Sequence, residues 1–105
     1  RKQADLEAAQ AHLSARGIDV STFVCDNAVD EQAFALADTA IARLGRVDIL
    51  VNNAGASWGA PTEDHPIDAF DKIMNLNIRA LFVLSQRIAK QSMIPNRYGR
   101  IINMS

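Results

Sequence analysis

Residues 47–55 read Val-Asp-Ile-Leu-Val-Asn-Asn-Ala-Gly, an apolar run that gives way to two amides, a small residue and a glycine. The run over 47–51 is apolar apart from Asp48, which is typical of a parallel strand covered on both faces. Residues 52–55 then predict a polar, tightly turned ledge at the carboxyl end of that strand. Because ligands of open α/β sheets bind at this edge, the stretch indicates a ligand-binding α/β fold.

The flanking segments alternate between helical and extended patterns. The spacing of apolar residues predicts helices over 1–16, 30–44 and 66–93, and strands over 18–24 and 100–104. Strict alternation of helix and strand predicts a parallel sheet with crossover helices.

Three features refine the predicted helix boundaries. Gly45 stands where the second helix should end, and Pro66 suits the first helical position of the third. Asn75 and Asn77 interrupt the apolar spacing of that long third helix. They predict a kink, or a junction between two helices.

Composition bounds the classes of function. The chain has 105 residues, is 49% hydrophobic and carries a net charge of −1, so nothing in its charge favours nucleic acid or an anionic membrane as partner. No apolar stretch approaches the roughly 18 residues of a membrane span. The single cysteine, Cys25, excludes an internal disulfide and suits a core position. His12 and His65 lack metal-ligand spacing. We expect a cytoplasmic protein without a metal.

Four motifs occur in order along the chain: Asp26 after the first predicted strand, Asn-Asn-Ala-Gly at 52–55, Asn77 in the long helix, and Gly-Arg-Ile-Ile-Asn-Met-Ser at 99–105. Together they resemble the classical branch of the short-chain dehydrogenase/reductase family over essentially the whole chain. Residues 56–61 and 74–77 look most like gluconate 5-dehydrogenase-like and 3-oxoacyl-carrier-protein-reductase-like members.

The resemblance implies a Rossmann-like, doubly wound parallel sheet with strand order 3-2-1-4-5-6, of which this chain holds strands 3, 4 and 5. Strands 47–51 and 100–104 should then pair in parallel, and strand 18–24 should have no backbone partner within the chain. Residues 1–105 would form a single partial NAD(P)-binding domain. It would lack the N-terminal glycine-rich loop and the C-terminal catalytic half of a longer parent protein.

The implied activity of the parent is hydride transfer between NADP, or alternatively NAD, and the hydroxyl/ketone group of a small-molecule substrate, in a homo-oligomer. Tyr98 does not match the family's catalytic tyrosine, because Ile102 stands where its lysine partner belongs. The 105-residue segment alone should therefore be inactive. A non-catalytic dinucleotide-binding regulator on the same fold is the alternative.

The resemblance also assigns roles to residues outside the ledge. Asn77 would hold a water in a proton relay through its backbone carbonyl, or else be a plain asparagine at a helix break. Asp26 would accept a hydrogen bond from the adenine amino group, or else cap the second helix, while the backbone of Asn27 meets the adenine ring. Arg1 would contact a 2′-phosphate, or else be a solvated helix-end arginine.

At the ledge, Asn53, Ala54 and Gly55 would run beneath the cofactor ribose, with Gly55 permitting close backbone approach. A plain strand-to-loop turn is the alternative. Asn52 is expected to tie neighbouring strands together rather than touch the cofactor. Trp58, in the following loop, either borders the substrate pocket or covers the helix layer.

Overall fold

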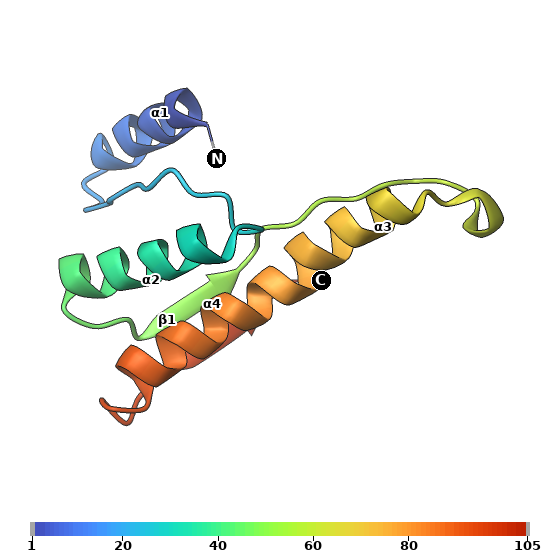
Figure 1. Cartoon of the computed structure of the whole chain (residues 1–105). Helices are drawn as coiled ribbons and strands as arrows, with labels where there is room; N and C mark the ends of the chain where they lie inside the picture. The colour runs from blue at the N-terminus through green and yellow to red at the C-terminus, as the bar shows by residue number, and fades with distance from the viewer. Residues whose placement is uncertain (1, 105) are drawn as a thin grey trace.

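The computed structural model describes residues 2–104 and shows an α/β arrangement around a two-stranded parallel sheet (Figure 1). Strands β1 (Ile49–Asn52) and β2 (Arg100–Asn103) pair with Ile49 opposite Arg100 and Asn52 opposite Asn103. The ladder is closed by hydrogen bonds from the Arg100 amide to the Asp48 carbonyl, 2.8 Å, and from the Met104 amide to the Asn52 carbonyl, 3.1 Å. The predicted parallel pairing of these two strands is confirmed.

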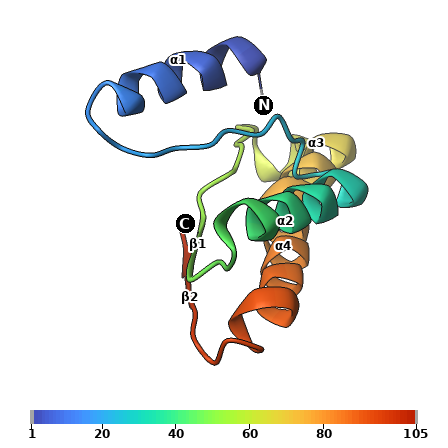
Figure 2. The same cartoon turned by 90° about the vertical axis from the view of Figure 1, so that its left-hand side faces the viewer.

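Helices α2 (Asp30–Leu44) and α4 (Ala80–Ile88) lie on the same side of the two strands (Figure 2). Side chains alternate across a strand, so Leu50 faces this layer while Ile49 and Val51 face away and are 59% and 51% exposed. Coverage of β1 on both faces, which its apolar run predicts, is therefore not found among residues 2–104. When successive right-handed crossovers move in the same direction across a sheet, their helices lie on the same face of that sheet. This explains why α2 and α4 cover one face of β1 and leave the other uncovered.

The core lies between this helix layer and the sheet. Its buried members come from α2, the segment before β1, α4 and the turn after it: Ala37, Val47, Leu84, Ile88 and Met93. Only small residues, Ala33 and Ala37, are buried on α2, which lets α2 and α4 approach closely. Gly45 ends α2 with a φ of 82°, a conformation that glycine adopts without strain.

The strand expected over 18–24 is not formed. This segment is irregular, and the sheet of the described chain contains β1 and β2 alone. The prediction of a strand over 18–24 is therefore wrong. The expected topology leaves this segment without a backbone partner, and a strand needs such a partner, so the missing ladder agrees with that topology. Side chains hold the segment instead, with Gln10 Nε2 donating to the Val20 carbonyl at 3.2 Å.

That glutamine lies on α1 (Gln3–Ser14), the helix predicted at the start of the chain. None of the residues of α1 is buried. Gly17 follows its end with a φ of 78°. Among the described residues, the helix is attached mainly through the extended segment that follows it, and Figure 1 shows it apart from the α2–α4 layer.

The long helix predicted over 66–93 is continuous but has four parts. They are α3 (Ile67–Met74), the π turn η2 (Asn75–Arg79), α4, and a second π turn η3 (Ala89–Met93). The interruption predicted from Asn75 and Asn77 is thus a junction of two α-helices through a π turn. The prediction that Pro66 is the first helical residue is wrong by one position. Its ψ of 135° is extended, so Pro66 is the N-cap of α3, and its carbonyl accepts the Phe70 amide at 3.0 Å. A short 3-10 helix, η1 (Thr62–Asp64), precedes it.

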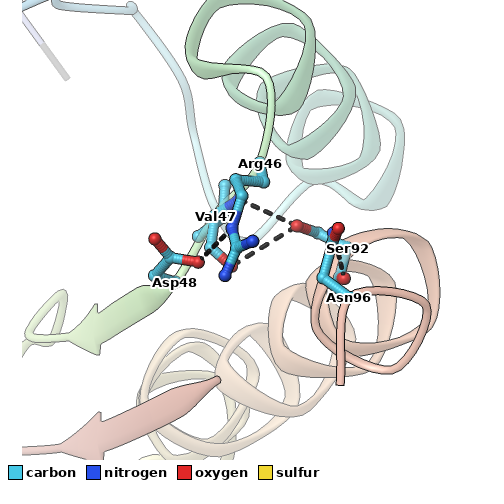
Figure 3. A network of polar contacts seen from close by, with 5 residues as sticks. All are labelled: Arg46, Val47, Asp48, Ser92 and Asn96. Carbon is cyan, nitrogen blue, oxygen red and sulfur yellow. Dashed lines mark hydrogen bonds and ion pairs between the residues drawn. The ribbon is translucent and has the colours of Figure 1, made fainter. Parts of the chain in front are cut away.

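A buried serine joins the turn after α4 to the entry of β1 (Figure 3). Ser92 is 1% exposed, and its Oγ accepts the Val47 amide at 2.8 Å and donates to the Val47 carbonyl at 3.4 Å. The Ser92 carbonyl accepts from Asn96 Nδ2 at 2.7 Å. The same stretch of chain is flanked by the ion pair between Arg46 and Asp48. Ser92 therefore sets the position of β1 against the helix layer.

Replacing this serine should destabilise the fold. Ser92→Ala leaves the buried amide of Val47 without its partner, which costs about 1–3 kcal/mol in the free energy of unfolding. Urea unfolding of the whole protein measures the change. Ser14→Ala, at the exposed end of α1, is the matched control and should change the free energy by less than about 0.5 kcal/mol. Equal losses in the two variants would contradict this account.

Candidate functional site

The carboxyl ends of both strands open into one groove. Asn53, Ala54 and Gly55 leave β1 there, and Asn103 and Met104 stand at the end of β2. The groove has a volume of about 680 Å³. The rest of its lining comes from the loop after the ledge, the π turn and α4: Ala56, Ser57, Asn77, Ile78 and Leu81. The structure therefore brings the predicted ledge and the predicted helix asparagine to one site.

Asn77 clamps the loop that follows the ledge. Its Oδ1 accepts the Ala56 amide at 2.9 Å, and its Nδ2 donates to the Ala56 carbonyl at 2.8 Å. One side-chain amide thus satisfies both backbone groups of a residue 21 positions earlier. Gly55 makes this approach possible, because a Cβ built there would lie 3.2 Å from Asn77 Oδ1. An alanine at position 55 would therefore force the Asn77 side chain to shift by a few tenths of an ångström. The approach of a cofactor ribose to Gly55 stays a prediction.

The π turn widens the helix at this clamp. The Ala80 amide bonds to the Asn75 carbonyl five residues back, instead of the four of an α-helix. Such turns change the pairing of neighbouring backbone carbonyls and occur frequently at functional sites. The altered stretch contains Asn77 and lies beside the groove.

Ion pairs hold the helix layer in place beside the site. Arg79, the last residue of the π turn, pairs with Asp30 at the start of α2. Arg87 pairs with Asp38 at 2.9 Å and lies over the Phe34 ring at 4.9 Å. The Arg79 hydrogen bond lowers the pKa of the Asp30 carboxyl, and the Asp30 carboxylate in turn raises the pKa of Arg79. These contacts were not predicted, because opposite charges 49 positions apart give no local signal.

Asn52 links β1 to β2, as the sequence predicts, and it also links β1 to the helix layer. It is 8% exposed, and its Nδ2 donates to Asn103 Oδ1 at 2.9 Å and to Ser85 Oγ at 3.0 Å. The role of Ser85 on α4 was missed, because a serine within an apolar helical stripe gives no signal of its partner. Asn52 points into the structure, which leaves the next residues to form the ledge.

The predicted helix-capping role of Asp26 is wrong, because the N-cap of α2 is Val29 and no side chain caps it. Asp26 instead forms a turn just before this helix. Its Oδ1 accepts the Ala28 amide at 3.0 Å, and its own amide donates to Gln32 Oε1 at 2.8 Å. A carboxylate offers two oxygens with several acceptor positions, so this turn does not exhaust Asp26 as an acceptor. Asp26 thus has a defined structural role in the turn that precedes α2.

Asn27 lies closer to the ledge. It lines a smaller hollow that also includes Asn53 and Ala54, and its Oδ1 accepts from the Cys25 thiol at 3.2 Å. Burial, and then the neighbouring Asp26 charge, raise the pKa of Cys25. The thiol is therefore protonated at neutral pH, which favours the predicted packing role over a nucleophile. Arg1 lies outside the described residues.

Two classes of feature are absent from residues 2–104. They contain no group of three or more histidine, cysteine, aspartate or glutamate residues able to hold a metal ion. Of the helices described in this range, none is long and apolar enough to cross a membrane.

Comparison with known proteins agrees with this architecture. The family model for short chain dehydrogenase matches residues 1–105. Gluconate 5-dehydrogenase of Gluconobacter oxydans (strain 621H) is 37% identical over 105 residues, covering 99% of this chain and 40% of that protein. NAD⁺-bound xylitol dehydrogenase superposes with a TM-score of 0.91 at 32% identity, over 97% of this chain and 39% of that one. A metagenomic short-chain oxidoreductase in complex with NADP gives a TM-score of 0.93 at 32% identity, over 100% of this chain and 48% of that one.

The chain belongs to the short chain dehydrogenase family, as its four motifs predict. Its fold is the corresponding part of a Rossmann-like α/β structure with a parallel sheet. The chain spans 40% of the length of the similar gluconate 5-dehydrogenase.

The Asp30–Arg79 pair should make stability depend on acid pH. Because the folded pKa of Asp30 lies below its ordinary value of 3.8, its contribution is complete above that value and is lost as the pH falls through the folded pKa. The difference in free energy of unfolding between the native protein and Asp30→Asn should therefore be constant above about pH 5 and shrink below about pH 4. In an Arg79→Ala background Asp30→Asn should show no such pH dependence. The same pH dependence with and without Arg79 would contradict this assignment.

Proposed function

We propose that the whole protein is an NAD(P)-dependent oxidoreductase that transfers a hydride between its cofactor and the hydroxyl/ketone group of a small-molecule substrate. The observation that carries this proposal is the groove at the carboxyl ends of β1 and β2, which the Asn77 clamp holds open beside the ledge. The chain's similarity to a gluconate 5-dehydrogenase and to an NAD⁺-bound xylitol dehydrogenase supports the proposal. This similarity also disfavours a non-catalytic regulator.

The residues of the groove fit the sugar of a nicotinamide nucleotide. Asn53, Ala54 and Gly55 present amide and backbone groups suited to ribose hydroxyls, and Gly55 keeps the floor free of a side chain. The cofactor, when bound, supplies the hydride chemistry, and the protein positions it. NADP is the preferred candidate and NAD the alternative, with Arg1 proposed to contact a 2′-phosphate.

The other end of the nucleotide is proposed to lie toward the start of α2. Asn27 lines the small hollow next to Asn53 and Ala54, so its backbone would meet the adenine ring. Asp26, one residue before, would use its remaining acceptor capacity for the adenine amino group. The carboxylate would thus serve the turn and the ligand together.

Asn77 is proposed to act through two different groups. Its side chain positions the loop through Ala56. Its backbone carbonyl, within the π turn beside the groove, would hold a water molecule in the proton relay of the reaction. The two roles are compatible, because the side chain and the carbonyl are separate hydrogen-bonding groups.

We further propose that residues 1–105 are a single partial nucleotide-binding domain of a cytoplasmic homo-oligomer. The homo-oligomer is supported by the apolar surface that the described residues leave exposed on the long helix. Ile67, Phe70 and Phe82 are 72%, 52% and 61% exposed, and Met74 and Ile78 extend the same stripe. A stripe of this size favours contact with another protein surface.

A glycine pair provides the test of the nucleotide site. Gly55→Ala places a Cβ against Asn77 Oδ1, so it should weaken NADP or NAD binding by the whole protein about tenfold or more, measured by calorimetric titration. Gly59→Ala is the control, because a Cβ there meets nothing within 4 Å. Oxidation of a secondary alcohol, followed by the absorbance of the reduced nicotinamide, should fall in parallel. Equal affinities in the two variants, or no nucleotide binding by the native protein, would contradict the proposal.

A further inference from the structure

The turn that follows the long helix contains a left-handed arginine. Arg97 has a φ of 55° and is the only non-glycine residue with a positive φ among residues 2–104. Its amide donates to the Ile94 carbonyl and the Tyr98 amide donates to the Met93 carbonyl, both at 3.1 Å. These two bonds form a capping motif whose left-handed position is usually a glycine, because other residues are strained there. Strain of this kind is concentrated at positions where a side chain has a function.

Two further arginines are held beside the next residue. The guanidinium carbons of Arg46 and Arg100 lie 5.9 and 5.0 Å from the centroid of the Tyr98 ring, within the range of a cation–π contact. Arg100 Nη1 also donates to the Gly99 carbonyl at 2.9 Å. A Cβ at Gly99 would overlap the Met93 side chain, so the backbone packs tightly here. The turn therefore holds the Arg100 side chain in position before any ligand binds.

The turn borders a hollow with an excess of positive charge. The hollow has a volume of about 460 Å³, which is the size of a small-molecule site. Arg97 and Arg100 line it, and neither takes part in an ion pair among the described residues, whereas Arg46 pairs with Asp48. Two unpaired guanidinium charges exceed the partial charge of about −0.5 at the carboxyl end of a helix. The hollow therefore attracts an anion.

This hollow lies at the opposite end of the sheet from the groove. Arg100 is the first residue of β2, and Ile49, which pairs with it, is the first residue of β1. Each strand has four residues, which span about 13 Å, and the groove opens at their other end. A ligand in the hollow would therefore occupy a second site.

The side chains around the hollow fit a phosphate monoester. Guanidinium groups bind phosphate oxygens through paired N–H donors, and the Tyr98 hydroxyl supplies another donor. A phosphate monoester carries a charge of about −1.5 to −2 at neutral pH, which matches the two unpaired arginines. Ile94 and Ile101, which are 70% and 41% exposed, provide apolar surface for the carbon part of the ester.

We propose that this hollow binds a small phosphate monoester at a site separate from the nucleotide groove. Arg97 and Arg100 bind the phosphate oxygens, and Arg97 keeps its strained backbone because its side chain is needed there. An arginine that served only the helix dipole would need no left-handed backbone, since the dipole favours cations throughout the last turn. The inference does not depend on the proposed oxidoreductase function.

Backbone amide NMR shifts of the whole protein test this site directly. Inorganic phosphate and phenyl phosphate are titrated at constant ionic strength, with sodium chloride as the reference. The Gly99 and Arg100 signals should shift saturably with both, and phenyl phosphate should bind more tightly because its ring contacts the two isoleucines. The Kd should rise about tenfold in Arg97→Gln, as for the loss of one charged hydrogen bond. Arg16→Gln, which removes an exposed arginine near the end of α1, is the control and should leave the Kd unchanged.

A glycine at position 97 separates binding from stability. Arg97→Gly relieves the strain of the turn, so the Tm without phosphate should rise by about 2–4 °C while the Kd increases as in Arg97→Gln. A Tm below that of the native protein would mean that the arginine serves the fold, and would overturn the inference. Equal Kd values in Arg97→Gln and Arg16→Gln would also overturn it. The same holds for shifts no larger than those with sodium chloride, and for phenyl phosphate that binds no more tightly than inorganic phosphate.

Discussion

The two hydrogen bonds between the Asn77 side chain and the backbone of Ala56 are the constraint on which the site depends. They fix the loop after β1 to the π turn between α3 and α4, and both of these segments line the groove. The supporting contacts serve this geometry. Gly55 leaves space for the asparagine, the Arg79–Asp30 pair braces the π turn against α2, and Asn52 secures the strand from which the ledge departs.

Much of the fold could be predicted, because its determinants are local or periodic. The apolar run before residue 52 and its counterpart near residue 101 predicted a parallel pair, and both strands form. The segment 18–24 shows the limit of such reasoning. Its composition favours a strand, but strand formation depends on a backbone partner, and the described chain supplies none. Residue patterns report the preference of a segment and not the presence of its neighbour.

The sequence predicted which residues form the groove, but it did not predict the contacts between them. The Asn-Asn-Ala-Gly motif and Asn77 identified the groove, since their residue types and order are specific. The clamp itself was not predicted, because nothing local pairs a helix asparagine with a backbone 21 positions earlier. The same holds for Ser92 and Val47, which are 45 positions apart. Asp26 uses one carboxylate oxygen in a structural turn, and its contact with the adenine amino group stays a prediction.

The most direct test of this account couples the clamp to the nucleotide. Amide exchange at Ala56 and NADP affinity would both be measured on the whole protein, in Asn77→Ala and in the control Asn75→Ala, which alters the same π turn without touching the loop. Asn77→Ala should speed exchange at Ala56 and weaken NADP binding, each about tenfold, as expected for the loss of a hydrogen-bonded clamp. Asn75→Ala should change neither. Faster exchange at Ala56 with unaltered NADP affinity would contradict the claim that the clamp builds the nucleotide site.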